Sequence, residues 1–264
     1  MRVWGAFFDL KFLACVLLCL EIVGCGGSSP KSQTATQPTA AAPAVPSSSD
    51  ASVAARNLQF EGANYPYFVF APSSCAAMEC PAILLAHGAG GNGLDFLEIW
   101  KQFADQNGII LVAPTLPLGS SQITADTETK VPQLFPQIVE AAKAEWKIDS
   151  RRVYLFGYSA GGYTIYDAAM LDSTYFAAAG VFAAVIAPDY DWIVQRATRK
   201  TPIAIYIGEN DQVFSVDSAR ATRDLLLGNG FTVHYVEIPN QDHNYGTVSG
   251  QVNTDVWAFM SQYS

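Results

Sequence analysis

The segment Gly157-Tyr158-Ser159-Ala160-Gly161-Gly162 decides how this chain folds, because of what lies on either side of it. Residues 153–156 before it are apolar and β-prone, which predicts a buried strand. Residues 160–170 after it have the pattern of a helix packed on a sheet. A serine between glycines at a strand-to-helix turn is typical of a nucleophile elbow, which lifts the hydroxyl above the sheet. The glycines are needed because backbone segments approach too closely there for a Cβ atom.

Strands and helices alternate on both sides of this turn. Further strands are expected at 67–70, 82–86, 109–113, 178–186, 203–207 and 232–238, and helices at 93–106, 132–146, 215–227 and 257–263. This order predicts an α/β fold with a mostly parallel central sheet and helices on both faces. No separate lid domain is expected, and the stretch 187–200 is the candidate cap.

The N-terminal residues are expected to lie outside this fold. Residues 1–24 form an expected signal peptide, since the apolar run 12–20 is too short to span a bilayer. The run ends in Ile22-Val23-Gly24-Cys25, which resembles a bacterial lipobox and predicts lipidation of Cys25. The alternative is an ordinary secretory signal in which Cys25 is incidental. Residues 25–56 are rich in Ser, Thr, Ala and Pro, which predicts a flexible tether, and 57–264 suit one catalytic domain.

Charge and cysteine content narrow the function classes. The formal net charge is −9 and the sequence has no basic stripe, so nucleic-acid binding is not expected. Cys75 and Cys80 are the two cysteines of the 57–264 domain, and in an exported protein they are expected to form a disulfide. A metal site would need further ligands near them, so neither a metal nor a cofactor is expected.

A serine nucleophile needs a general base, and the chain has three histidines. His87 ends a predicted strand but precedes the serine, whereas the acid and the histidine follow the serine in the chain order of this kind of fold. His234 lies within the strand 232–238, where side chains face helices or core. His243 follows that strand, and catalytic groups of open α/β sheets lie at the carboxyl ends of strands. His243 is therefore the predicted base, against the alternative of a surface loop histidine.

The acid that orients this histidine is expected at another strand end. Asp211 follows the strand 203–207 directly and is the predicted acid. Glu209, Asp189 and Asp191 are the alternatives. Asp217 is expected to open a helix, where its charge suits the helix dipole, and Asp242 to shape a loop.

Two backbone N–H groups are expected to form an oxyanion hole. One belongs to Ala160, next to the nucleophile, and the other to Ala89 in the glycine-rich loop after His87. That loop lacks the Lys-Ser/Thr of a phosphate-binding loop, which disfavours phosphate. Tyr158, Trp192 and Tyr245 are the predicted substrate-binding aromatics, with ordinary packing as the alternative for each.

These motifs resemble those of the α/β-hydrolases, in the branch of extracellular polyhydroxyalkanoate depolymerases, feruloyl esterases and acetyl xylan esterases. The resemblance extends from residue 57 to the end and rests on segments 87–93, 95–96, 149–154 and 208–213 and on His243. It implies that Ser159, Asp211 and His243 form a triad, with Ala89 and Ala160 in the oxyanion hole. It also implies a serine hydrolase that cleaves small-molecule or polymeric carboxylic esters through an acyl-enzyme, without a cofactor.

Two other functions stay open at this point: a serine peptidase or amidase on the same fold, and a non-catalytic envelope protein that uses the fold for binding. The N-terminal segment predicts either a cell-envelope lipoprotein, at the outer membrane or cell surface, or a secreted protein. The lipid anchor is the expected membrane contact, and the sequence predicts no particular oligomeric state.

Overall fold

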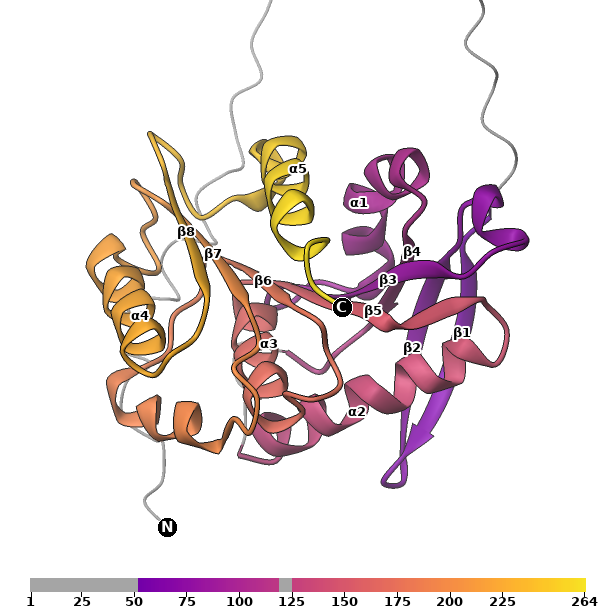
Figure 1. Cartoon of the computed structure of the whole chain (residues 1–264), viewed down its shortest axis with the longest axis horizontal. Helices are drawn as coiled ribbons and strands as arrows, with labels where there is room; N and C mark the ends of the chain where they lie inside the picture. Colours follow the sequence, from indigo (N-terminus) through magenta and orange to yellow (C-terminus); the bar gives the residue numbers. More distant parts are fainter. Residues whose placement is uncertain (1–51, 119–124) are drawn as a thin grey trace, which may run out of the picture. The chain divides into compact units, whose positions relative to one another are not determined.

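The computed structural model describes residues 52–118 and 125–264, and its strands form one sheet (Figure 1). The strands are β1 (Ala54–Phe60), β2 (Ala63–Phe70), β3 (Cys80–Ala86), β4 (Ile110–Pro114), β5 (Ile148–Tyr158), β6 (Ala179–Phe182), β7 (Ile203–Gly208) and β8 (Val233–Ile238). Their order across the sheet is β1-β2-β4-β3-β5-β6-β7-β8. The expected signal peptide 1–24, Cys25 and most of the expected tether lie outside the described residues.

The sheet is parallel from β4 through β8, and β1 and β2 join it as an antiparallel pair. Every residue of β3, β4, β6 and β7 is buried, as their continuous apolar runs predict for strands covered on both faces. The sequence analysis did not predict β1, which begins ahead of residue 57. β1 alternates half-buried and exposed residues, and a turn with positive φ at Glu61 and Gly62 connects it to β2.

Helices cover both faces of the sheet, as expected. They are α1 (Gly93–Asn107), α2 (Ala125–Lys143), α3 (Ala160–Leu171), α4 (Val216–Gly228) and α5 (Ser249–Met260). In Figure 1, α1 and α5 lie on one face of the sheet and α2 and α3 on the other. The buried side chains accordingly form two clusters, one with α1 and α5 and one with α2 and α3.

Several expected boundaries were wrong, among them the start of β5, which begins at Ile148 instead of residue 153. The strand expected at 178–186 ends at Phe182, because Ala183 has a positive φ of 54° that no extended strand continues. The last helix begins at Ser249 instead of residue 257, since its first turns contain glycine and polar residues that predict a helix poorly. α2 begins at Ala125 instead of residue 132 and contains both Pro132 and Pro136. The candidate cap forms a short 3-10 segment, η3 (Pro188–Arg196).

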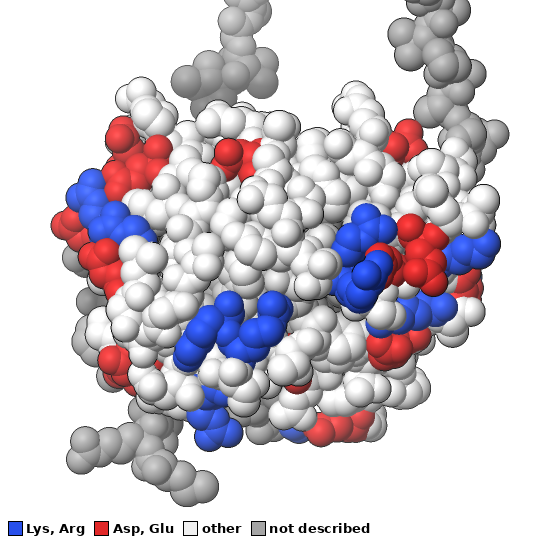
Figure 2. Space-filling model, viewed as in Figure 1, with Lys and Arg blue, Asp and Glu red and all other residues white. Residues whose placement is uncertain are grey.

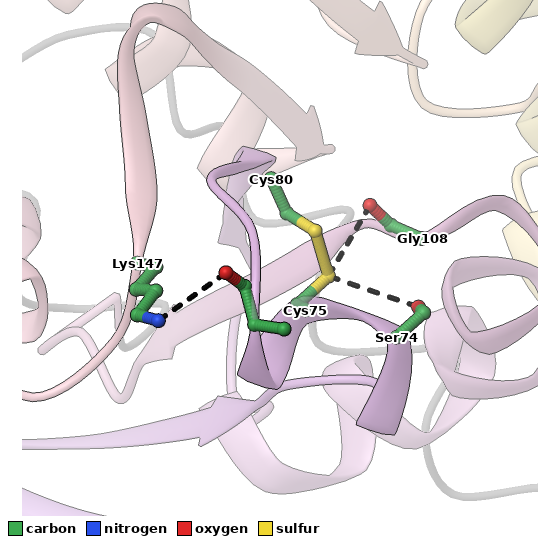
Figure 3. Close-up of a disulfide and its surroundings, with 6 residues drawn as sticks. Ser74, Cys75, Cys80, Gly108 and Lys147 are labelled. Atoms are coloured by element: carbon green, nitrogen blue, oxygen red, sulfur yellow. Dashed lines mark hydrogen bonds between the residues drawn. A yellow bond between two sulfur atoms is a disulfide. The ribbon is translucent and has the colours of Figure 1, made fainter.

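Cys75 and Cys80 lie together at the amino end of β3, where their sulfur atoms are joined at 2.10 Å (Figure 3). Cys75 belongs to the 3-10 turn η2 (Ser73–Ala76), and Cys80 is the first residue of β3. The Lys147 ammonium donates to the carbonyl of Ala77 within the loop that they close. The disulfide therefore ties this loop to the end of the sheet opposite the one where β5 ends, next to Ser159.

The surface carries groups of both charges. On the face shown in Figure 2, basic and acidic side chains lie together in mixed groups at the two sides, a basic group lies below the centre, and a broad uncharged area lies between them. Within the described ranges, no helix has the length and apolar character needed to cross a bilayer.

Candidate active site

Ser159 occupies a strained turn between β5 and α3. Its φ and ψ are 53° and −120°, a left-handed conformation that costs a non-glycine residue about 1–3 kcal/mol. Two backbone hydrogen bonds hold the turn: the Ser159 N–H donates to the carbonyl of Phe182 at 3.0 Å, and the Ser159 carbonyl accepts from Gly162 at 2.8 Å. Surrounding structure thus over-determines the serine's conformation, as at a nucleophile elbow.

Close backbone packing explains the glycines around this serine. A Cβ atom added to Gly161 would lie 2.1 Å from the carbonyl oxygen of Ala86, and one added to Gly157 would lie 2.6 Å from the carbonyl oxygen of Gly161. Both distances are far below van der Waals contact. α3 therefore reaches the ends of β3 and β5 only because these positions lack side chains.

The structure brings Ser159, His243 and Asp211 together in one chain of hydrogen bonds. His243 Nε2 lies 2.9 Å from Ser159 Oγ, and His243 Nδ1 lies 2.8 Å from Asp211 Oδ2. The other carboxylate oxygen, Asp211 Oδ1, accepts from the backbone N–H groups of Val213 and Phe214 at 2.8 and 2.9 Å. The three residues follow the carboxyl ends of β5, β7 and β8, which lie at one edge of the sheet.

The surroundings of Asp211 keep its carboxyl group ionised. Burial raises its pKa, but the hydrogen bonds from His243 and from the N–H groups of Phe214 and Val213 outweigh burial and hold the pKa below its usual value. An ionised carboxylate only accepts hydrogen bonds, so the His243 proton lies on Nδ1. The Nε2 lone pair then faces the Ser159 hydroxyl, as a general base requires.

The alternative bases and acids lie elsewhere. His234 Nε2 contacts Asp255 Oδ2 at 2.6 Å, beside α5. Asp217 lies in the first turn of α4, and Asp242 accepts the backbone N–H of Asn244, as expected for a helix-opening and a loop-shaping residue. The other candidate acids, Glu209, Asp189 and Asp191, lie at the end of β7 and in η3. In the described part of the chain, Asp211 is the carboxylate bonded to His243.

His87 organises the glycine-rich loop after β3, a role that the sequence analysis did not assign. Its buried ring accepts the backbone N–H of Leu116 at Nε2, at 2.9 Å, so the ring proton lies on Nδ1, which donates to the Gly88 carbonyl at 2.7 Å. Burial lowers the pKa of His87, which agrees with this neutral form. The only available signal was its position at the end of a buried strand.

The glycine-rich loop contains Ala89, one of the two residues predicted for the oxyanion hole. Gly90 donates to the carbonyl of Leu118 and Gly91 to that of Gly88, whereas the N–H of Ala89 has no acceptor among the described residues. Ala160 is the first residue of α3, so its N–H has no carbonyl acceptor one turn earlier. These two groups are the ones predicted to form the oxyanion hole.

A cavity of about 240 Å³ adjoins this site, between the loop after β3, the start of α1 and the segment after His243. Tyr158, one of the predicted substrate-binding aromatics, is part of its lining. Tyr245 also contributes to its lining, although its ring is buried and its hydroxyl donates to the Asn253 carboxamide. Trp192 is 50% exposed on η3 and packs edge-on against Tyr190, outside this lining.

Two aromatic rings hold the imidazole in place. The ring centroids of Tyr158 and Phe214 lie 5.3 and 5.8 Å from that of His243. Phe214 in turn packs edge-on against Tyr163 of α3. Within the residues that the structure describes, no three His, Cys, Asp or Glu side chains are grouped as metal ligands.

Comparison with known proteins relates the chain to enzymes that act on esters. Residues 83–252 match the family model described as "Alpha/beta hydrolase family". Over 158 residues the chain is 34% identical to the bifunctional acetylxylan esterase/xylanase XynS20E of Neocallimastix patriciarum. The matched region covers 59% of this chain and 22% of that protein. The chain thus spans less than a quarter of this relative's length.

Solved structures share the fold. A thermostable esterase superposes with a TM-score of 0.66 at 24% identity, covering 80% of this chain and 63% of that one. The ferulic acid esterase of Anaeromyces mucronatus gives a TM-score of 0.62 at 16% identity, covering 75% of this chain and 86% of that one.

Proposed function

Because this chain belongs to the alpha/beta hydrolase family, we propose that it is a serine esterase that hydrolyses carboxylic esters through a Ser159–His243–Asp211 triad. The observation that carries the proposal is the continuous chain of hydrogen bonds from Ser159 Oγ through His243 to the buried Asp211 carboxylate. Sequence similarity to an acetylxylan esterase/xylanase supports an ester as the substrate. That ester is either a small molecule or a polymer, and no cofactor takes part.

The reaction begins with attack of Ser159 Oγ on the ester carbonyl while His243 Nε2 takes the hydroxyl proton. The N–H groups of Ala89 and Ala160 stabilise the negative oxygen of the tetrahedral intermediate. His243 then gives its proton to the departing alcohol oxygen, which leaves an acyl group on Ser159. Water attacks this acyl-enzyme with His243 again as the base, and the carboxylic acid is released as His243 returns this proton to Ser159 Oγ.

Labelling with a fluorophosphonate tests the nucleophile. We expect the wild-type protein to be labelled and Ser159→Ala to remain unlabelled while its circular dichroism spectrum matches that of the wild type. Equal labelling of both would contradict the proposal. A panel of p-nitrophenyl esters and peptide anilides then separates esterase from peptidase or amidase activity, and faster cleavage of the anilides would overturn the ester assignment.

The proposed enzyme works outside the cytoplasm. The apolar run 12–20 and the lipobox-like segment ending at Cys25 support export, with Cys25 lipidated and residues 26–53 as a tether. An oxidising compartment also suits the Cys75–Cys80 disulfide. Membrane fractionation of the wild type and Cys25→Ser, each expressed in a bacterial host, tests the anchor. Identical partitioning and processing of the two would rule out lipidation.

A further inference from the structure

The cavity lies next to the nucleophile, although its described lining contains the neighbours of Ser159 and His243 and not these two residues themselves. Gly88 forms part of its wall, and a Cβ atom added to Gly88 would lie 3.5 Å from Ser159 Cβ and 2.9 Å from the Tyr158 ring. The lining then continues over Ala89 of the proposed oxyanion hole and into α1. A group that fills this cavity is therefore attached close to the reacting carbonyl.

The direction of proton transfer determines whether the group in the cavity is the alcohol part or the acyl part of the ester. In the tetrahedral intermediate the carbonyl oxygen faces the N–H groups of Ala89 and Ala160, and the departing oxygen must receive its proton from His243 Nε2. The departing alcohol therefore lies on the His243 side of the carbonyl. Residues 244–246, which directly follow His243, line the cavity, whereas no residue of the Asp211 loop, α3 or η3 does.

The lining combines an apolar wall with a polar rim. Phe96, Ile99 and the Tyr158 ring supply the apolar part. Asp95 and Asn244 supply polar groups: Asp95 Oδ2 accepts from the Asn92 amide at 2.7 Å, and Asn244 Oδ1 accepts from the Gly246 N–H at 2.9 Å. The Asn244 amide nitrogen has no acceptor in the described part of the chain and is free to donate to a ligand.

Among the described residues that line the cavity, the only charged side chain is acidic. Asp95 lies in the first turn of α1, where its carboxylate already offsets the positive end of the helix dipole. The described lining contains no lysine or arginine that would compensate a second negative charge. An anionic alcohol is thus disfavoured there, and a neutral or cationic one is accepted.

The size of the cavity limits the alcohol to about one ring. Its volume of about 240 Å³ is below the roughly 300–1,000 Å³ of sites that enclose drug-sized ligands. A single ring can lay one apolar face against Ile99 and Phe96 and direct polar groups to Asn244.

From this arrangement, and on the basis of the proposed ester hydrolysis, we propose that the cavity between α1 and the His243 segment binds the alcohol part of the ester. It selects an uncharged or cationic, ring-sized alcohol with one apolar face. Ile99 and Asp95 are its specificity-determining residues, and the acyl group lies outside it.

Narrowing the cavity tests the assignment. Ile99 is 41% exposed, so Ile99→Trp fills the cavity without disturbing the core. Leu94→Trp is the matched control, because Leu94 is a 36% exposed residue of the same helix outside the lining. Two substrate series are needed: acetate esters of methanol and benzyl alcohol, and methyl esters of acids from acetate to hexanoate.

We expect Ile99→Trp to lower the ratio of kcat/KM for benzyl acetate to that for methyl acetate by about tenfold. The order of preference along the methyl ester series should stay that of the wild type. Leu94→Trp should change neither the benzyl-to-methyl acetate ratio nor this acyl-chain preference. A change in acyl-chain preference with an unaltered alcohol ratio would overturn the proposal and make the cavity an acyl pocket. If Leu94→Trp lowers the benzyl-to-methyl acetate ratio as much as Ile99→Trp does, the effect does not come from the cavity and the proposal fails.

A second variant tests the charge selection. Asp95→Asn is expected to raise kcat/KM for 4-carboxybenzyl acetate relative to benzyl acetate by a few-fold, with the gain shrinking as salt is added. An unchanged ratio would contradict the role of Asp95. If the wild type neither hydrolyses any of these esters nor reacts with a fluorophosphonate, the proposed function itself fails. The alcohol assignment fails alone if the wild type is active and the variants leave the alcohol ratios unaltered.

Discussion

His243 Nδ1 lies 2.8 Å from Asp211 Oδ2, although the two residues are 32 positions apart in the chain. The contact arises because β7 and β8 are parallel neighbours whose register pairs Gly208 with Ile238. Both strands therefore end at the same level, and the loops that follow them lie side by side. The alignment of the proposed base and acid is a consequence of sheet register.

Loss of the Asp211 charge is expected to abolish most of the activity. Asp211→Asn should lower kcat by about 10³–10⁴-fold, because an amide favours the wrong histidine tautomer and cannot stabilise the imidazolium. Ester hydrolysis under substrate saturation measures the effect. Glu209→Gln is the control, since it alters an exposed carboxylate near the same strand end, and its kcat should stay within about twofold of wild type. A comparable loss in both variants would show that Asp211 has no special role.

His87 is expected to make the protein less stable as the pH falls. Its pKa is lowered in the folded protein by burial, so between its ordinary value of about 6.5 and the lowered value the unfolded chain binds the additional proton. Stability therefore rises with pH across this window and is lost on acidification. Urea unfolding at several pH values should show this slope in the wild type and a smaller one in His87→Gln. Identical slopes would mean that His87 is not buried in its neutral form.

The elbow glycines are expected to be intolerant of even one methyl group. Gly161→Ala places a Cβ 2.1 Å from the Ala86 carbonyl oxygen, so it should separate α3 from β3 and yield insoluble or inactive protein. Gly228→Ala is the contrasting change, because an added Cβ there has no heavy atom within 4 Å. It should leave activity intact and stabilise by up to about 1 kcal/mol. Soluble expression and thermal unfolding distinguish the two variants.

Removal of the disulfide is expected to affect stability and spare catalysis. The loop between Cys75 and Cys80 spans a sequence separation of 5, so the double variant Cys75→Ser/Cys80→Ser should lose about 2 kcal/mol of unfolding free energy. Its kcat/KM should match the wild type, since the disulfide lies at the amino end of β3 and the site at the carboxyl end. Urea titration and ester hydrolysis measure the two effects. A large loss of kcat/KM in correctly folded protein would contradict this separation.

Tyr245 is expected to anchor the segment that carries His243. Its buried hydroxyl donates to Asn253 of α5, and Tyr245→Phe leaves that carboxamide without this donor. The loss should be about 1–3 kcal/mol of unfolding free energy. A fall in kcat should accompany it, because His243 is two residues away. Tyr65→Phe in β2, far from the site in the sequence, is the control and should change neither quantity.

The three residues of the proposed triad could all be predicted from the sequence. Ser159 could be predicted because strand, glycines and helix are all encoded within a short segment. His243 and Asp211 could be named because parallel strands end at one edge, so position in the chain restricts which side chains can meet. The hydrogen bonds of the structure bring these three together, while their catalytic roles stay predictions.

Other features depended on contacts between distant segments. His87 holds the glycine-rich loop through the backbone of Leu116, 29 positions away, and no motif encodes that bond. Trp192 was predicted to bind substrate, yet η3 holds it outside the cavity lining, against Tyr190.

The amino-acid sequence by itself determined the α/β class, the mostly parallel sheet and the place of the nucleophile, because hydrophobic period and glycine spacing are local properties. Family membership and the sheet confirm that class. The tertiary structure alone decided where the cavity lies, which residues line it and what His87 binds. These depend on strand register and on side-chain packing between segments remote in the chain, which no local pattern specifies.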